Sequence, residues 1–101
     1  MTKMTTKQFI QNLEDTFKGC LDIAKKKNSD YANSNNPFKN FEMSLQVGVD
    51  PDRAILVRLS DKISRISNLL NRDGNVKDER LEDTIDDAIN YLAILKAYKS
   101  K

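Results

Sequence analysis

The chain has 101 residues, enough for one small domain with a single core, and its 39% hydrophobic and 32% charged residues are typical of a mostly helical protein. A formal net charge of +2 is too small to indicate DNA binding. A single cysteine and the lack of histidine exclude an internal disulfide, a His-dependent catalytic triad and histidine-bound zinc.

The N-terminus has no apolar run of the kind found in signal peptides, and no segment reaches the roughly 18 apolar residues that span a bilayer. We therefore expect a cytoplasmic protein.

The first predicted helix covers residues 6–27. Thr5 or Thr6 can cap its start, and it should end in three lysines whose charge suits a helix C-terminus. Its apolar residues at helical spacing are Ile10, Leu13, Phe17, Leu21 and Ala24. The polar stretch NSDYANSNNPF that follows predicts a loop, because such side chains bond their own backbone in turns.

Two pairs of a capping residue and proline predict the next helix starts. Asn36-Pro37 opens a short helix over 37–47, which Gly48 closes, and Asp50-Pro51 opens a long helix over 51–72. The positions expected to face the core are Phe38, Phe41, Leu45, Ile55, Leu59, Ile63, Ile66 and Leu70.

The last predicted helix covers residues 79–98, after a turn at Asp73-Gly74 and a cap at Asp78. Its core face should contain Leu81, Ile85, Ala88, Leu92 and Leu95. The segment 88–95, AINYLAIL, is uncharged on every side, so it runs through the middle of the domain or a second subunit covers it. We predict a single all-α domain over residues 1–101, a small bundle of two to three long helices and one short helix, completed by homo-oligomerisation.

Polar residues form one line on each of the two long C-terminal helices. The lines are Arg58, Asp61, Arg65, Asn68 and Arg72 on the first, and Asp83, Asp87 and Asn90 on the second. Antiparallel helices would bring the lines together, in pairs such as Arg65 with Asp87. Alternatively, the arginines with Lys62 bind an anion, or Asp83 and Asp87 hold magnesium.

Asn90 lies within an apolar run, where an unpaired amide would cost roughly 1 to 3 kcal/mol. Its expected partner is Asp61 or Asn68, its own equivalent in a second subunit, or a ligand. The predicted loop and short helix add Asp30, Tyr31, Phe38, Asn40 and Phe41. Aromatic rings beside amides suit a nucleobase, which needs stacking and hydrogen bonds to its edges.

Three blocks, NSDYANSNNPFKNF, GVDPDRAILVRLSDKISRISNLL and VKDERLEDTIDDAINYLAIL, resemble the nucleotide-modification-associated domain 1 family. The resemblance implies a small helical phage or bacterial domain linked to nucleotide or modified-base metabolism. The matching residues are Asp30, Tyr31, Asn40, Phe41, Arg58, Asp61, Lys62, Arg65, Asn68, Glu82, Asp83, Asp87 and Asn90.

More distantly, the last two helices resemble MazG-type nucleoside triphosphate pyrophosphohydrolases, which hold magnesium with carboxylates from two facing helices. Asp83 and Asp86 can imitate one of the acidic pairs of that family, with Asp87 as an alternative ligand. The other pair is missing, because Asp61 is followed by Lys62, Ser64 and Arg65 rather than by a second acid.

These patterns lead to three expectations. The first is a phage-type protein that holds a nucleotide or nucleotide-derived signal without cleaving it, with sequestration of a host immune signal as an anti-defence use. Its ligand residues would be Asp30, Tyr31, Asn40, Phe41, Arg58, Asp61, Lys62, Arg65, Asn68 and Asn90. The second is a magnesium-dependent pyrophosphohydrolase, for which Asp83 and Asp87 would be metal ligands, and the third is a protein-binding module.

Overall fold

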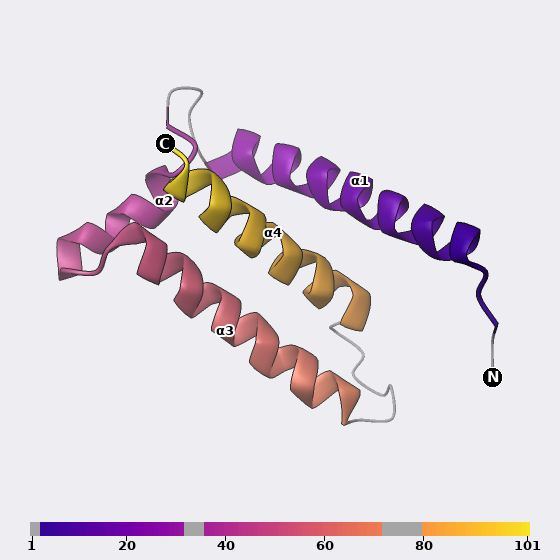
Figure 1. Cartoon of the computed structure of the whole chain (residues 1–101). Helices are drawn as coiled ribbons and strands as arrows, with labels where there is room; N and C mark the ends of the chain where they lie inside the picture. Colours follow the sequence, from indigo (N-terminus) through magenta and orange to yellow (C-terminus); the bar gives the residue numbers. More distant parts are fainter. Residues whose placement is uncertain (1–2, 32–35, 72–79) are drawn as a thin grey trace.

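The computed structural model describes residues 3–31, 36–71 and 80–101, with the backbone alone for residues 29–31 (Figure 1). The described residues form α1 (Thr6–Tyr31), α2 (Lys39–Glu42), the short 3-10 helix η1 (Met43–Val47), α3 (Pro51–Leu70) and α4 (Leu81–Lys99), and no strand. The predicted all-α class is therefore confirmed. No helix in these ranges combines the length and apolarity that crossing a membrane requires.

Helices α3 and α4 form an antiparallel pair, as the sequence predicts. The ammonium of Lys99 lies 3.3 Å from the carboxylate of Asp52, and that of Lys62 lies 2.9 Å from Asp87. The end of α4 therefore meets the start of α3. Helix α3 ends at Leu70 and α4 begins at Leu81, each two residues inside the predicted limit. Arg72, the predicted Asp-Gly turn and the predicted Asp78 cap lie outside the described residues.

Helix α1 begins with a reciprocal cap at Thr5. The Thr5 side-chain oxygen accepts the backbone N–H of Gln8 at 3.1 Å, and Gln8 Oε1 accepts the N–H of Thr5 at 2.9 Å. The helix continues to Tyr31, so the predicted end at Lys27 and the predicted loop at residues 28–31 are wrong. Local turn propensity is overridden here because Lys27 is bonded to α4 and Asn28 lines a cleft against the other helices.

The predicted helix over 37–47 is two short pieces, α2 and η1. Asn36 Oδ1 accepts the N–H of Phe38 at 3.1 Å, and the helix begins after this turn rather than at Pro37. The hydroxyl oxygen of Ser44 lies 2.7 Å from the backbone oxygens of both Phe41 and Val49, either of which can accept its proton, where the chain changes to the tighter 3-10 form. Gly48 closes the segment with a φ of 75°, as predicted.

The core is small and lies where α4 meets α1, α2 and α3. Its buried members are Cys20, Phe41, Pro51, Ile55, Thr84 and Ala88. Many side chains that the helical spacing predicts as core are exposed: Ile10, Leu13, Phe17, Leu21, Leu45, Ile63, Leu70, Ile85 and Leu92. The physical reason is that each helix has fewer neighbours than its apolar width requires, and the radius of gyration of 15.9 Å exceeds the roughly 13 Å of a compact chain of this length.

Candidate functional site

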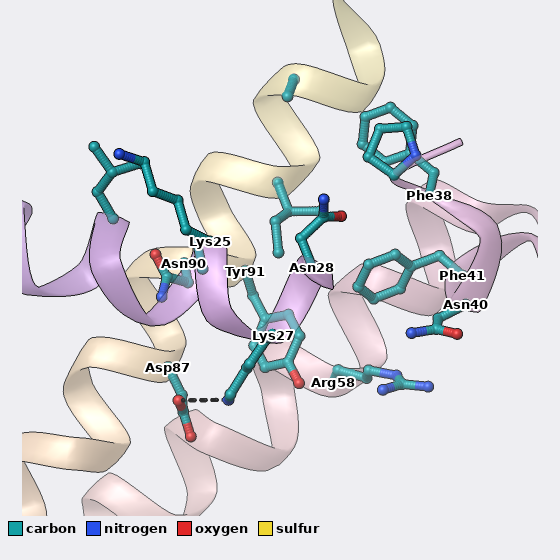
Figure 2. Close-up of a pocket in the computed structure, with 15 residues that line it drawn as sticks. Lys25, Lys27, Asn28, Phe38, Asn40, Phe41, Arg58, Asp87, Asn90 and Tyr91 are labelled. Carbon is teal, nitrogen blue, oxygen red and sulfur yellow. Dashed lines mark hydrogen bonds and ion pairs between the residues drawn. The ribbon is translucent and has the colours of Figure 1, made fainter. Parts of the chain in front are cut away.

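A cleft of about 530 Å³ opens where the C-terminal half of α1 and the segment around α2 meet the α3–α4 pair (Figure 2). Its aromatic and amide lining consists of Phe38, Phe41, Tyr91, Asn28, Asn40 and Asn90. Its charged lining consists of Lys25, Lys27, Arg58 and Asp87. Because these residues come from four helices, the cleft exists only in the folded chain.

The aromatic wall of the cleft is held by contacts between rings. Phe41 is 9% exposed, and its ring meets that of Tyr91 edge to face, with centroids 6.4 Å apart and planes at 83°. The guanidinium carbon of Arg58 lies 5.3 Å from the centre of the Phe41 ring. Figure 2 shows Arg58 and Asn40 on the same side of this ring. The wall therefore places a cation and an amide beside a fixed aromatic face.

Asp87 joins three helices at the floor of the cleft. One carboxylate oxygen lies 2.9 Å from Nζ of Lys62 on α3, and the other lies 3.3 Å from Nζ of Lys27 on α1. Burial alone would raise the pKa of Asp87, but the hydrogen bond from Lys62 and the charge of Lys27 outweigh it, so the pKa lies below its ordinary value. Asp87 is therefore ionised and pairs with lysines, whereas Arg65 was the expected partner.

Asn90 is satisfied by α1. Its Nδ2 donates to the backbone oxygen of Cys20 at 3.0 Å, which is none of the partners expected from the sequence. Cys20 is itself 3% exposed, and burial, followed by the nearby charge of Asp86, raises the pKa of its thiol. The thiol therefore stays protonated at neutral pH and is not a reactive nucleophile.

A second, smaller hollow of about 280 Å³ follows one side of α3. Its lining residues are Arg58, Asp61, Lys62, Arg65 and Tyr91. Three of them, Arg58, Asp61 and Arg65, belong to the polar line that the helical spacing predicts, and Lys62 directly follows Asp61. Arg58 and Tyr91 also line the larger cleft, so the two hollows are adjacent.

The structure gathers most of the predicted ligand residues. Asn40, Phe41, Arg58 and Asn90 line the larger cleft, and Arg58, Asp61, Lys62 and Arg65 line the smaller hollow. Asn68 is exposed on α3 and lines neither. Asp30 and Tyr31 belong to the last turn of α1, and their side chains lie outside the described residues.

The predicted magnesium ligands do not fit a metal site in this arrangement. Asp83 is exposed in the first turn of α4, whereas both oxygens of Asp87 face lysine ammonium groups. Within the described ranges, no three Asp, Glu, Cys or His side chains are grouped closely enough to hold a metal ion. A hard divalent cation needs several oxygen ligands, which this donor set does not offer.

Five polar or aromatic residues of the larger cleft were not in the predicted ligand or metal sets: Lys25, Lys27, Asn28, Phe38 and Tyr91. Lys27 and Asn28 were assigned to a helix end and a loop, and the continuation of α1 is what turns them toward α4. Tyr91 follows Asn90 directly on α4, so the sequence already places an aromatic ring beside the predicted polar line, although Tyr91 was not assigned to the ligand.

The chain matches no protein-family model, no curated protein and no solved structure. The resemblance to the nucleotide-modification-associated domain therefore stays a prediction, and the geometry of the two hollows is what bears on function.

Proposed function

We propose that this protein binds a nucleotide or a nucleotide-derived small molecule, with the base in the larger cleft and the phosphates at the smaller hollow. One observation carries the proposal: Arg58 and Tyr91 line both hollows, so an aromatic and amide chamber adjoins a basic surface. A volume of about 530 Å³ falls within the range of roughly 300 to 1,000 Å³ that small-molecule sites occupy.

The larger cleft has the groups that a base requires. Phe38 is only half-buried and offers an aromatic ring, and stacking on such a ring contributes about 1 to 3 kcal/mol per base. Phe41 is buried behind Arg58 and supports this wall. The amides of Asn28 and Asn40 each carry both a donor and an acceptor, so they can pair with the edge of a base. An apolar chamber with a few amides fits a base better than it fits a phosphate.

The smaller hollow has the groups that a phosphate requires. Arg58 and Arg65 have planar guanidinium groups that can donate paired hydrogen bonds to phosphate oxygens. Lys62 shares its charge with Asp87, and Asp61 supplies one carboxylate, so the hollow keeps an excess of positive charge. Asp61 can accept a hydrogen bond from a ribose hydroxyl.

Binding without cleavage fits these residues better than hydrolysis does. Pyrophosphate-bond hydrolysis of the MazG type uses several carboxylates around magnesium, whereas Asp87 is held by two lysines and arginines line the adjoining hollow. In a phage setting, a small binder of this kind would act by sequestering a nucleotide signal of host immunity in the cytoplasm.

The experiment is a thermal-shift screen of the purified protein against mononucleotides, cyclic oligonucleotides and ADP-ribose derivatives, with and without magnesium, followed by calorimetry on each hit. We expect at least one nucleotide to raise the Tm and to be recovered unchanged. Arg58→Ala should weaken that ligand at least about tenfold, because it removes a charge-assisted contact from both hollows.

Arg53→Ala is the matched control, since Arg53 is exposed on the same helix and lines neither hollow. No shift with any nucleotide, together with no small molecule released on denaturation, would refute the proposal. Release of pyrophosphate from a triphosphate in the presence of magnesium would instead support the pyrophosphohydrolase alternative.

A further inference from the structure

The apolar stripe of α1 continues past the helices that cover it. Ile10, Leu13, Phe17, Cys20 and Ala24 are spaced by three and four residues in turn, which is the pattern of a two-helix seam. Cys20 is buried against α4, where its thiol lies 3.8 Å from the backbone oxygen of Asp86. Figure 1 shows the N-terminal part of α1 extending beyond the start of α4.

The uncovered part of this stripe consists of large side chains. Ile10 is 47% exposed, Leu13 is 37% exposed and Phe17 is 57% exposed, and Phe9 beside them is 50% exposed. The accessible surface of the chain is 8150 Å², against roughly 5,800 Å² for a folded monomer of this size. This excess is spread over the whole chain, and the exposed apolar side chains of α1 are one part of it.

We propose that a second copy of this chain covers the stripe, with the two α1 helices side by side and antiparallel. Ile10 then packs against the partner's Leu13, and Leu13 against the partner's Ile10. Phe17 packs over the partner's Thr6. A two-fold axis between residues 11 and 12 uses the whole uncovered stripe and stops at Cys20, which α4 already covers.

Charge selects the antiparallel direction. Lys7 and Glu14 are both exposed and lie seven residues apart along one edge of the stripe. In an antiparallel pair this edge faces its own equivalent, so Lys7 meets the partner's Glu14 and Glu14 meets the partner's Lys7. In a parallel pair in register, Glu14 would instead face the partner's Phe9, which has no charge, and Lys7 would not meet Glu14, so no charge pair would form.

The proposed pairing leaves the larger cleft of each subunit open. Asn28, which lines the larger cleft, lies on the far side of Cys20 from the two-fold axis. At 1.5 Å per residue, the two Asn28 positions are about 50 Å apart along the joined helices. The dimer therefore carries two independent binding sites, and its formation can be tested without a ligand.

Sedimentation of the ligand-free protein should show a dimer that Leu13→Asp dissociates, with a loss of affinity of at least about a hundredfold. Asn12→Asp is the matched control, since it adds the same charge to the neighbouring position outside the stripe, and it should leave the dimer unchanged. Leu56→Asp is a second control on the exposed face of α3. A monomeric wild-type protein, or dissociation by Leu56→Asp and not by Leu13→Asp, would overturn the proposal.

The antiparallel direction of the two α1 helices is tested by exchanging charges at Lys7 and Glu14. Both residues are exposed, so these variants should fold as the wild-type protein does. Lys7→Glu and Glu14→Lys should each weaken the dimer about tenfold, because two like-charge pairs replace two opposite ones. The double variant should recover the wild-type affinity. Failure of the double variant to recover would exclude this antiparallel register.

A spin-label distance gives an independent answer. With Cys20→Ala to remove the native thiol and Asp22→Cys as the labelling site, the two labels should be roughly 30 Å apart along the helices in the proposed dimer. A separation close to the width of two helices would mean a parallel pair and would contradict the proposal.

Discussion

The larger cleft and the smaller hollow differ in how they are built. The smaller hollow takes four of its five lining residues from α3, on one face of a single helix. The larger cleft takes its lining from α1, the α2 region, α3 and α4, and it depends on how these elements dock. A surface on one helix changes little when the packing between helices changes. A cleft between four helices changes shape when a contact that positions them is broken.

This difference assigns separate tasks to the two hollows. The aromatic and amide chamber is shaped by tertiary contacts, which suits discrimination among bases. The row of cations on α3 needs only an intact helix, which suits the less specific recognition of phosphate. Substitutions that loosen docking should therefore impair base selectivity, whereas substitutions on α3 should lower affinity for every phosphorylated ligand.

The largest loss is expected for Phe41→Ala, which removes a ring that is both core and cleft wall. Phe41 is 9% exposed, and truncation of a buried phenylalanine destabilises a protein by about 3 to 5 kcal/mol. The loss should be seen as a lower midpoint in urea unfolding. Phe38→Ala is the control in the same segment, and its loss should be smaller because Phe38 is only half-buried. Equal losses would mean that Phe41 has no special place in the packing.

The next loss is expected for Asp87→Ala, because Lys27 and Lys62 then lose their shared partner. We expect the free energy of unfolding to fall by about 1 to 3 kcal/mol, measured by urea unfolding at neutral pH. Asp83→Ala is the matched control on the exposed side of α4 and should change little. A folded Asp87→Ala protein should also lose base selectivity before it loses affinity for phosphate.

The Asp87 contribution should disappear in acid. Its pKa lies below the ordinary value of 3.8, so the stabilisation is fully present above that pH and is lost as the pH falls through the lower folded-state pKa. The gap in unfolding free energy between the wild-type protein and Asp87→Asn should therefore be constant near neutrality and close below pH 3.8. A gap that persists unchanged in acid would contradict ionic pairing.

The same comparison explains how far the sequence could predict the site. Arg58, Asp61 and Arg65 follow the helical period, so spacing alone places them on one side of a helix, where all three line the smaller hollow. The short connection between the last two helices also predicted their antiparallel pairing. Both inferences need only local geometry, and the structure agrees with both.

The larger cleft could not be predicted because its assembly depends on contacts distant in sequence. Lys27 meets Asp87 across 60 positions and Asn90 meets Cys20 across 70, and no periodic pattern encodes either pair. Helical spacing likewise marked Ile10 and Leu13 as apolar without specifying what covers them. Helical spacing shows which face of a helix is apolar. Which helix or subunit covers that face depends on contacts between residues distant in sequence.

A smaller loss is expected for Asn90→Ala, which removes the bond from Asn90 Nδ2 to the backbone oxygen of Cys20. One such bond contributes about 0.5 to 1.5 kcal/mol, and thermal unfolding can resolve it. Asn90→Asp should be more damaging although it is nearly isosteric, because an acceptor then faces an acceptor. Asn68→Asp on exposed α3 is the control. Equal stability of Asn90→Asp and the wild-type protein would contradict the assigned bond.

The smallest effect is expected for Asp83→Asn, because Asp83 is exposed in the first turn of α4, where the helix dipole favours its charge only weakly. The free energy of unfolding should change by less than about 0.5 kcal/mol. Millimolar magnesium should not change the Tm of the wild-type protein or of the variant, because Asp87 is already paired with two lysines. If magnesium stabilised the wild-type protein and not Asp83→Asn, the carboxylates of α4 would have to gather around the ion. The smaller hollow would then be part of a metal site, and its arginines would serve hydrolysis rather than binding.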